Sequence, residues 1–160
     1  MAATLYVGRA RAAPGLIGQH PSDFALPAAA GSNVRLSEYR GQPVILVFWG
    51  SQCGACEKQL ALLDRLYSTY RTSGLATFGI SVDDDMTHAG EYAHAHPMSY
   101  PMLLDASKSV GRSFQIDRLP TTVMIDRAGV VRYIHSDDHF DERSYVMQIR
   151  ALLNDDVAVP

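Results

Sequence analysis

Residues 44–56 have the sequence Val44-Ile45-Leu46-Val47-Phe48-Trp49-Gly50-Ser51-Gln52-Cys53-Gly54-Ala55-Cys56. An apolar run of this length, with β-branched and aromatic side chains, predicts a strand that is buried on both faces. After Gly54 the apolar residues recur with helical spacing as far as about Tyr70, which predicts a helix. The two cysteines, which form a C-x-x-C pair, therefore lie where a buried strand passes into a helix.

Strand and helix patterns alternate along the rest of the chain. The carboxylates of Asp83, Asp84 and Asp85 are expected to cap a helix that ends before His96-Pro97. The other expected helices cover about 107–114 and 141–153, and the other expected strands cover 75–82, 102–104, 121–125 and 130–134, with a short hairpin from 24–26 and 34–36. This order predicts an α/β sandwich around a central mixed sheet.

The length of 160 residues suffices for one domain with a sizeable core. Residues 1–18 show no period, and two interpretations stay open for them: a disordered tail or the remnant of an export signal. Residues 19–156 form the expected domain, which is expected to be a monomer. The net charge of −3 gives no general attraction to nucleic acid, and no stretch approaches the roughly 20 apolar residues that span a bilayer.

Cys53 and Cys56 are the two cysteines of the chain, and their spacing suits chemistry better than cross-linking. A structural disulfide stabilises most when it closes a long loop, and this pair closes almost none. Three positions apart in a helix, their Cα atoms would lie about 5 Å apart, which a disulfide can span. At the helix N-terminus, lowering the thiol pKa of Cys53 from about 8.5 to ~6.5 corresponds to about 2.7 kcal/mol of preferential thiolate stabilisation. Cys53 is therefore expected to attack, and Cys56 to resolve the mixed disulfide.

Three segments carry a resemblance to a known family: residues 41–56, the sequence Leu119-Pro120-Thr121-Thr122, and the sequence Ile125-Asp126-Arg127-Ala128-Gly129. Over roughly residues 18–154 the chain resembles the TlpA/ResA branch of the thioredoxin-like proteins, within the AhpC/TSA and redoxin superfamily. The resemblance implies a thioredoxin fold with an extra N-terminal β-hairpin. It also implies a thiol–disulfide oxidoreductase that exchanges disulfides with protein cysteines and uses no cofactor besides its own disulfide.

The same resemblance implies roles for residues around the cysteines. The Leu119–Pro120 bond is expected to be cis, with Pro120 against the disulfide, where it excludes metal ions and joins Cys53 and Cys56 as a catalytic residue. The backbone of Leu119 is expected to pair with an incoming substrate strand. The expected substrate-binding residues are Trp49, Gly54, Ala55, Leu119 and Thr121, with Trp49 packed beneath the cysteines.

The chain departs from the family at two positions that bear on Cys56. Many thioredoxins have a buried acid where this chain has Val47, and ResA-like proteins tend to have a glutamate where it has Gln59. Neither side chain can accept a proton, so the proton acceptor for Cys56 stays unassigned. Gly54-Ala55 also replaces the commoner Gly-Pro, and the two residues between the cysteines influence the reduction potential.

Three other functions are alternatives to disulfide exchange. A peroxiredoxin-like thiol peroxidase is the main alternative, although its usual motif places threonine three residues before the reacting cysteine, where this chain has Gly50. Copper delivery through Cys53, Cys56 and His135 is a second, and a zinc site that adds His139 is a third. The resemblance favours an extracytoplasmic bacterial location, with protein disulfides and a membrane-bound electron donor as partners.

Overall fold

The computed structural model describes residues 15–136 and 141–154. Its central sheet has the strand order β5-β4-β3-β6-β7, in which β3, β4 and β5 are parallel and β6 and β7 run antiparallel to their neighbours. The strands are β3 (Val44–Trp49), β4 (Ala76–Ser81), β5 (Met102–Leu104), β6 (Thr121–Ile125) and β7 (Val131–His135). The small hairpin consists of β1 (Ala25–Leu26) and β2 (Val34–Arg35). This is the expected thioredoxin-like α/β fold with an added N-terminal hairpin.

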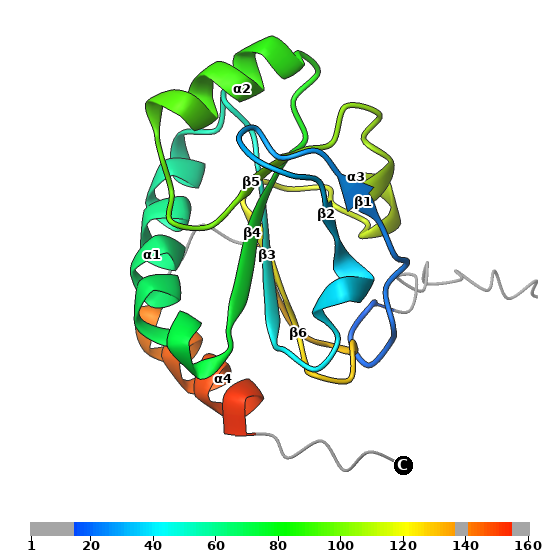
Figure 1. The fold of residues 1–160 in the computed structure, drawn as a ribbon, viewed down its shortest axis with the longest axis vertical. Helices are drawn as coiled ribbons and strands as arrows, with labels where there is room; N and C mark the ends of the chain where they lie inside the picture. Colours follow the sequence, from blue (N-terminus) through cyan, green and yellow to red (C-terminus); the bar gives the residue numbers. More distant parts are fainter. Residues whose placement is uncertain (1–14, 137–140, 155–160) are drawn as a thin grey trace, which may run out of the picture.

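Helices cover both faces of the sheet (Figure 1). They are α1 (Gly54–Tyr70), α2 (Met86–Ala95), α3 (Ser109–Ser113) and α4 (Glu142–Asn154), with short 3-10 turns at Leu36–Tyr39 and Arg71–Ser73. Helices α1, α2 and α4 lie on one face, and α3 lies with the β1–β2 hairpin on the other (Figure 1). The strand β3 and the helix α1 have the bounds that the apolar patterns predict.

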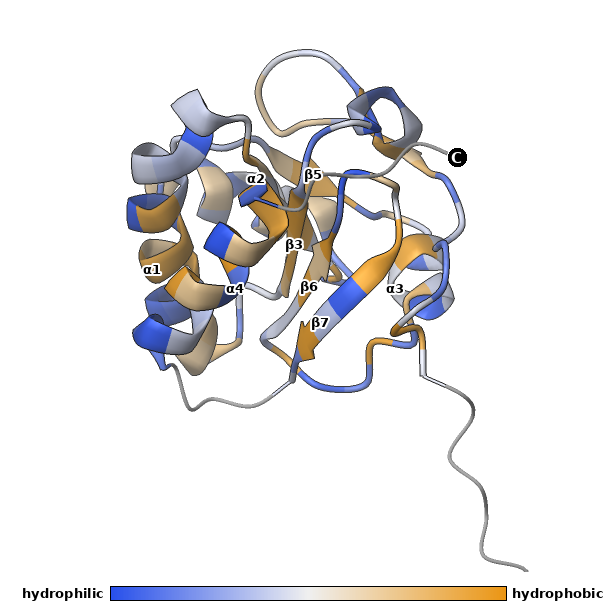
Figure 2. Cartoon of the chain, turned by 90° about the horizontal axis from the view of Figure 1, so that it is seen from below, coloured by the Kyte–Doolittle hydropathy of each residue, from blue (hydrophilic) through white to orange (hydrophobic). Residues whose placement is uncertain are grey.

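Alternation along β3 divides the core into two clusters. Ile45, Val47 and Trp49 face α1, α2 and α4, whereas Leu46 and Phe48 face α3 and the hairpin. All six side chains of β3 are buried, which agrees with the apolar strand colour in Figure 2. β3 is the central strand of the sheet. The chain that follows it therefore leaves the sheet between the two core clusters.

One sequence prediction differs from the structure. Asp85 alone is the N-cap of α2, accepting hydrogen bonds from the amides of Thr87 and His88, whereas Asp83 and Asp84 have other partners. At the N-terminus, the described chain begins at Gly15, and the amide of Gly18 donates to the carbonyl of Val131 at 2.7 Å. The chain is therefore hydrogen-bonded to β7 at Gly18.

Candidate active site

The cysteines lie where β3 passes into α1, as their sequence context predicts. Cys53 is the N-cap residue of α1, and Cys56 lies in its first turn. The two form a disulfide with a Cα–Cα distance of 5.3 Å. The loop before them is a tight turn, because the amide of Cys53 donates to the carbonyl of Gly50 at 3.1 Å. The pair can therefore open and close within a fixed helical turn.

The two sulfurs have different surroundings. Cys53 is half-buried between the exposed residues Gln52 and Gly54, whereas Cys56 is fully buried. In the described chain, the amides of Gly54 and Ala55 have no hydrogen-bond partner. These amides and the positive end of the helix dipole favour negative charge at Cys53. A thiolate is therefore stabilised at the sulfur that an external partner can reach.

The segment before β6 closes the other side of the site. The Leu119–Pro120 peptide bond is cis, as expected. Thr121 is paired in register with Phe48 of β3, which brings this segment beside Gly50. A Cβ atom added at Gly50 would lie 3.2 Å from the Leu119 Cδ1 atom. The hydroxyl of Thr121 donates to the carbonyl of Arg118 at 2.6 Å, and this hydrogen bond stabilises the loop before Pro120.

A carboxylate that the sequence analysis assigned to a helix cap instead holds the cysteine loop. Asp83 accepts hydrogen bonds from the Ser51 amide, at 2.9 and 3.1 Å, and from the Ser81 hydroxyl at 3.1 Å. Its Oδ1 atom also lies 3.3 Å from the position of a Cβ added at Gly50. The signal that could have identified Asp83 is its position at the carboxyl end of β4, next to β3, where functional side chains of parallel strands gather.

Gly50 also bears on the peroxidase alternative. A side chain at this position would crowd both Leu119 and Asp83, so these two side chains would have to shift by a few tenths of an ångström to admit the threonine of the usual peroxidase motif. The structure thus gives a physical reason for glycine at this position.

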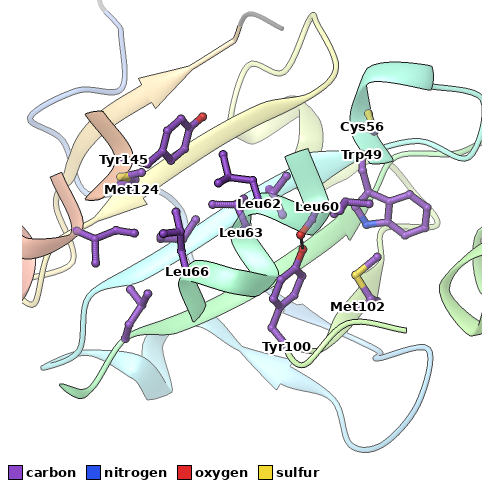
Figure 3. Packing of buried hydrophobic residues seen from close by; sticks show 14 of the residues in the cluster. Trp49, Cys56, Leu60, Leu62, Leu63, Leu66, Tyr100, Met102, Met124 and Tyr145 are labelled. Atoms are coloured by element: carbon purple, nitrogen blue, oxygen red, sulfur yellow. Dashed lines mark hydrogen bonds between the residues drawn. The ribbon is translucent and has the colours of Figure 1, made fainter. Parts of the chain in front are cut away.

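Trp49 lies inside the protein beneath the cysteines. It is fully buried in the same cluster as Cys56 (Figure 3). Its ring centroid lies 5.0 Å from that of Tyr92. A Cβ atom added at Gly79 would lie 3.2 Å from its Nε1 atom, so the absence of a side chain there admits the indole. Trp49 can therefore support the disulfide but cannot itself contact a partner.

Gln59 lies one helical turn after Cys56, in a buried polar cluster. Its Nε2 atom donates to the hydroxyls of Thr122 and Tyr145, each at 2.7 Å. Its Oε1 atom is buried and has no hydrogen-bond partner in the described chain. The cluster joins α1, β6 and α4, and it offers Cys56 an amide where an acid would accept a proton.

The described residues do not bring together the ligands of the copper alternative. His135 is stacked on Tyr145, and its Nε2 atom lies 2.6 Å from the Gln148 Oε1 atom. Within residues 15–136 and 141–154, no three His, Cys, Asp or Glu side chains gather closely enough to hold a metal ion. His139 of the zinc alternative lies outside the described residues.

A C-x-x-C disulfide at a helix N-terminus, faced by a cis proline on a thioredoxin-like sheet, defines the class of dithiol–disulfide oxidoreductases. The chain belongs to the AhpC/TSA family, whose model matches residues 17–134. Within that family it is a ResA/DsbE-like thiol–disulfide oxidoreductase.

Relatives and solved structures support this assignment. The thiol-disulfide oxidoreductase ResA of Geobacillus kaustophilus is 31% identical over 118 residues, which cover 74% of this chain and 68% of the relative. A crystal structure from Chlorobium tepidum, assigned as the thiol:disulfide interchange protein DsbE, superposes with a TM-score of 0.81 at 27% identity, over 86% of this chain and 98% of that one. A secreted Mycobacterium tuberculosis disulfide oxidoreductase shares the fold, with a TM-score of 0.70 at 17% identity over 81% and 96% of the two chains.

Proposed function

We propose that this oxidoreductase exchanges disulfides with cysteines of other proteins, with Cys53 as the attacking sulfur and Cys56 as the resolving one. The observation that carries the assignment of roles is the difference in burial between the two sulfurs of one disulfide. An external partner can approach Cys53, whereas Cys56 is covered by the core.

In the reducing direction the exchange has two steps. The Cys53 thiolate attacks one sulfur of the partner disulfide, forming a mixed disulfide and releasing the other partner sulfur as a thiolate. Cys56 then loses its proton and attacks the Cys53 sulfur, which forms the Cys53–Cys56 disulfide and releases the second partner thiolate. Two electrons pass to the partner, which takes up two protons. Oxidation of a partner dithiol is the reverse sequence.

The partner strand would add to the backbone before Pro120. In the described chain, the amides of Asp117, Arg118 and Leu119 have no hydrogen-bond partner, which supports pairing with an extended segment. Pro120 is buried, and Leu119 is half-buried beside Gly50. These residues, with Gly54 and Ala55 at the mouth of the site, would position the partner disulfide over Cys53.

An extracytoplasmic location suits this chemistry, because protein disulfides form and persist there. The secreted oxidoreductase with the same fold is consistent with such a location. No helix in the described part of the chain has the length and apolar character to cross a membrane. We further propose that the protein acts as a monomer and receives electrons from a membrane-bound donor, for example during cytochrome c maturation or copper-site assembly.

Serine variants of the two cysteines test the proposed roles. Cys53→Ser should abolish turnover of a protein disulfide, because the attacking sulfur is lost. Cys56→Ser should accumulate a mixed disulfide between Cys53 and the partner, seen as a dithiothreitol-sensitive adduct by mass spectrometry. Normal reduction of the protein disulfide by both variants would refute the proposal.

A further inference from the structure

A groove beside the proposed site of the partner strand is lined by basic residues, although the chain as a whole has a negative net charge. It has a volume of about 340 Å³, and its apolar walls include Val82, Ile116 and Leu119. Leu119 belongs both to this groove and to the active-site loop, where it approaches Gly50. The groove therefore begins where the partner strand would meet Cys53.

Three cations line the groove, although the net charge of the chain is −3. Lys108 pairs with Asp84, so its charge is locally balanced. Arg112 and Arg118 are exposed and form no ion pair or side-chain hydrogen bond with any described residue. Asp117 is the acidic residue of the groove lining, and it too forms no ion pair in the described chain. Outside the Lys108–Asp84 pair, the lining thus has two guanidinium groups and one carboxylate.

The walls that hold these arginines are well anchored. Asp105 is fully buried, and its carboxylate accepts hydrogen bonds from the amides of Val110 and Gly111 in α3. The turn after α3 is closed by a hydrogen bond from the Ile116 amide to the Gly111 carbonyl at 2.9 Å. Arg112 and Arg118 therefore extend from a fixed frame, and the groove exists before a partner binds.

We infer that this groove is an anion subsite that selects protein disulfides flanked by acidic residues, an inference that rests on the proposed function. A partner segment that pairs with the free backbone before Pro120 would place its neighbouring side chains along the groove. Planar guanidinium groups suit bidentate pairing with carboxylates. The apolar walls accommodate the methylene groups of Asp or Glu, and the exposed arginines bind their carboxylates.

The test uses three peptides with the same intramolecular disulfide, flanked by Asp and Glu, by Asn and Gln, or by Lys. Reaction of the reduced protein with each peptide is followed by the fluorescence of Trp49, the single tryptophan, which lies in the same cluster as Cys56. The wild-type protein should react with the acidic peptide about fivefold faster than with the neutral one at low salt. The preference should fall in 0.5 M salt, because exposed charges are screened.

Variants assign the preference to the groove. The double variant Arg112→Gln/Arg118→Gln should lose the preference and react with the acidic and neutral peptides at equal rates. Arg112→Glu/Arg118→Glu should transfer the preference to the Lys-flanked peptide. Arg71→Gln is the matched control, since Arg71 is exposed beyond the C-terminal end of α1, about 27 Å along the helix from Cys53, and should change neither rate.

Several results would overturn the subsite. The wild-type protein could show no preference for the acidic peptide, or the double variant could slow all peptides equally, as a merely structural role would. Arginine-dependent reaction with oxidised glutathione but not with peptides would assign the groove to a small-molecule disulfide instead. Failure to reduce even the neutral peptide would refute the proposed function itself, so the two failures are distinguishable.

Discussion

The Cα atoms of Cys53 and Cys56 are 5.3 Å apart, yet the two cysteines lie in contrasting regions of the molecule. The Cys53 region is polar and half-open: it has free helix amides, and its loop is held by the Asp83 carboxylate. The Cys56 region is closed and consists of Trp49, the leucines of α1, and the amide of Gln59. Negative charge is favoured in the surroundings of Cys53 and disfavoured in those of Cys56, which is what the proposed nucleophile and the proposed resolving thiol require.

The largest expected effect is a loss of stability when Trp49, in the closed region around Cys56, is truncated. Trp49→Ala would leave a cavity beneath Cys56 and should lower the free energy of unfolding by about 3–5 kcal/mol. Urea denaturation followed by circular dichroism measures it. Met147→Ala is the control, because Met147 is 63% exposed and its truncation should change little. An equal, small change in both variants would show that Trp49 does not support the site.

The next largest effect, on stability and turnover, is expected when Asp83, which holds the loop before Cys53, is replaced. Asp83→Ala leaves the Ser51 amide without its acceptor and should cost about 2 kcal/mol of stability, together with slower turnover. Asp83→Asn keeps an acceptor and should retain most of both. Asp84→Ala is the control, because Asp84 is the next residue in the chain and its side chain is 93% exposed. Denaturation and turnover of the three variants are compared, and identical behaviour of Asp83→Ala and Asp84→Ala would contradict the anchoring role.

A smaller effect, on rate, is expected when the closed region gains a proton acceptor. Gln59→Glu would place a carboxylate one turn after Cys56, able to accept the hydrogen bonds of Thr122 and Tyr145. Resolution of the mixed disulfide should become about tenfold faster above the carboxyl pKa and should return toward the wild-type rate below it. Rapid quenching with mass detection measures this step.

The control for that prediction is Gln52→Glu. It adds the same charge at an exposed residue next to Cys53, so resolution should not become faster. If both variants accelerate resolution to the same extent, the effect comes from net charge and not from a proton acceptor near Cys56.

The smallest expected effect is on the pH dependence of stability, at the N-cap of α2 and away from both sulfurs. The amide hydrogen bonds of Thr87 and then His88 lower the pKa of Asp85, the N-cap of α2. Because the folded-state pKa lies below the ordinary value of about 3.9, the stabilisation is present at neutral pH and is lost as the pH falls through the folded-state value. Asp85→Ala should therefore lower Tm by a few degrees at pH 7 and by less at pH 3, with unchanged redox activity. A Tm difference that grows on acidification would contradict this sign.

Sequence patterns were sufficient where the interactions are local. The bounds of β3 and α1 follow from an apolar run and a helical period, and the placement of Cys53 at the N-cap follows from their junction. Asp83 could not be assigned in this way, because its partner Ser51 is 32 positions away and meets it only through the pairing of β3 with β4. Likewise, Gln59 was recognised as a departure from the family, but its bond to Tyr145 spans 86 positions.

The central claim is that the half-buried sulfur at the N-cap of α1 ionises more readily than the buried one. Alkylation of the fully reduced protein with iodoacetamide across a range of pH, with mass mapping of the modified cysteine, tests it most directly. The account predicts that Cys53 reacts first, with an apparent pKa below the ordinary thiol value of about 8.5. Preferential modification of Cys56, or a Cys53 thiol that titrates at or above that value, would contradict it.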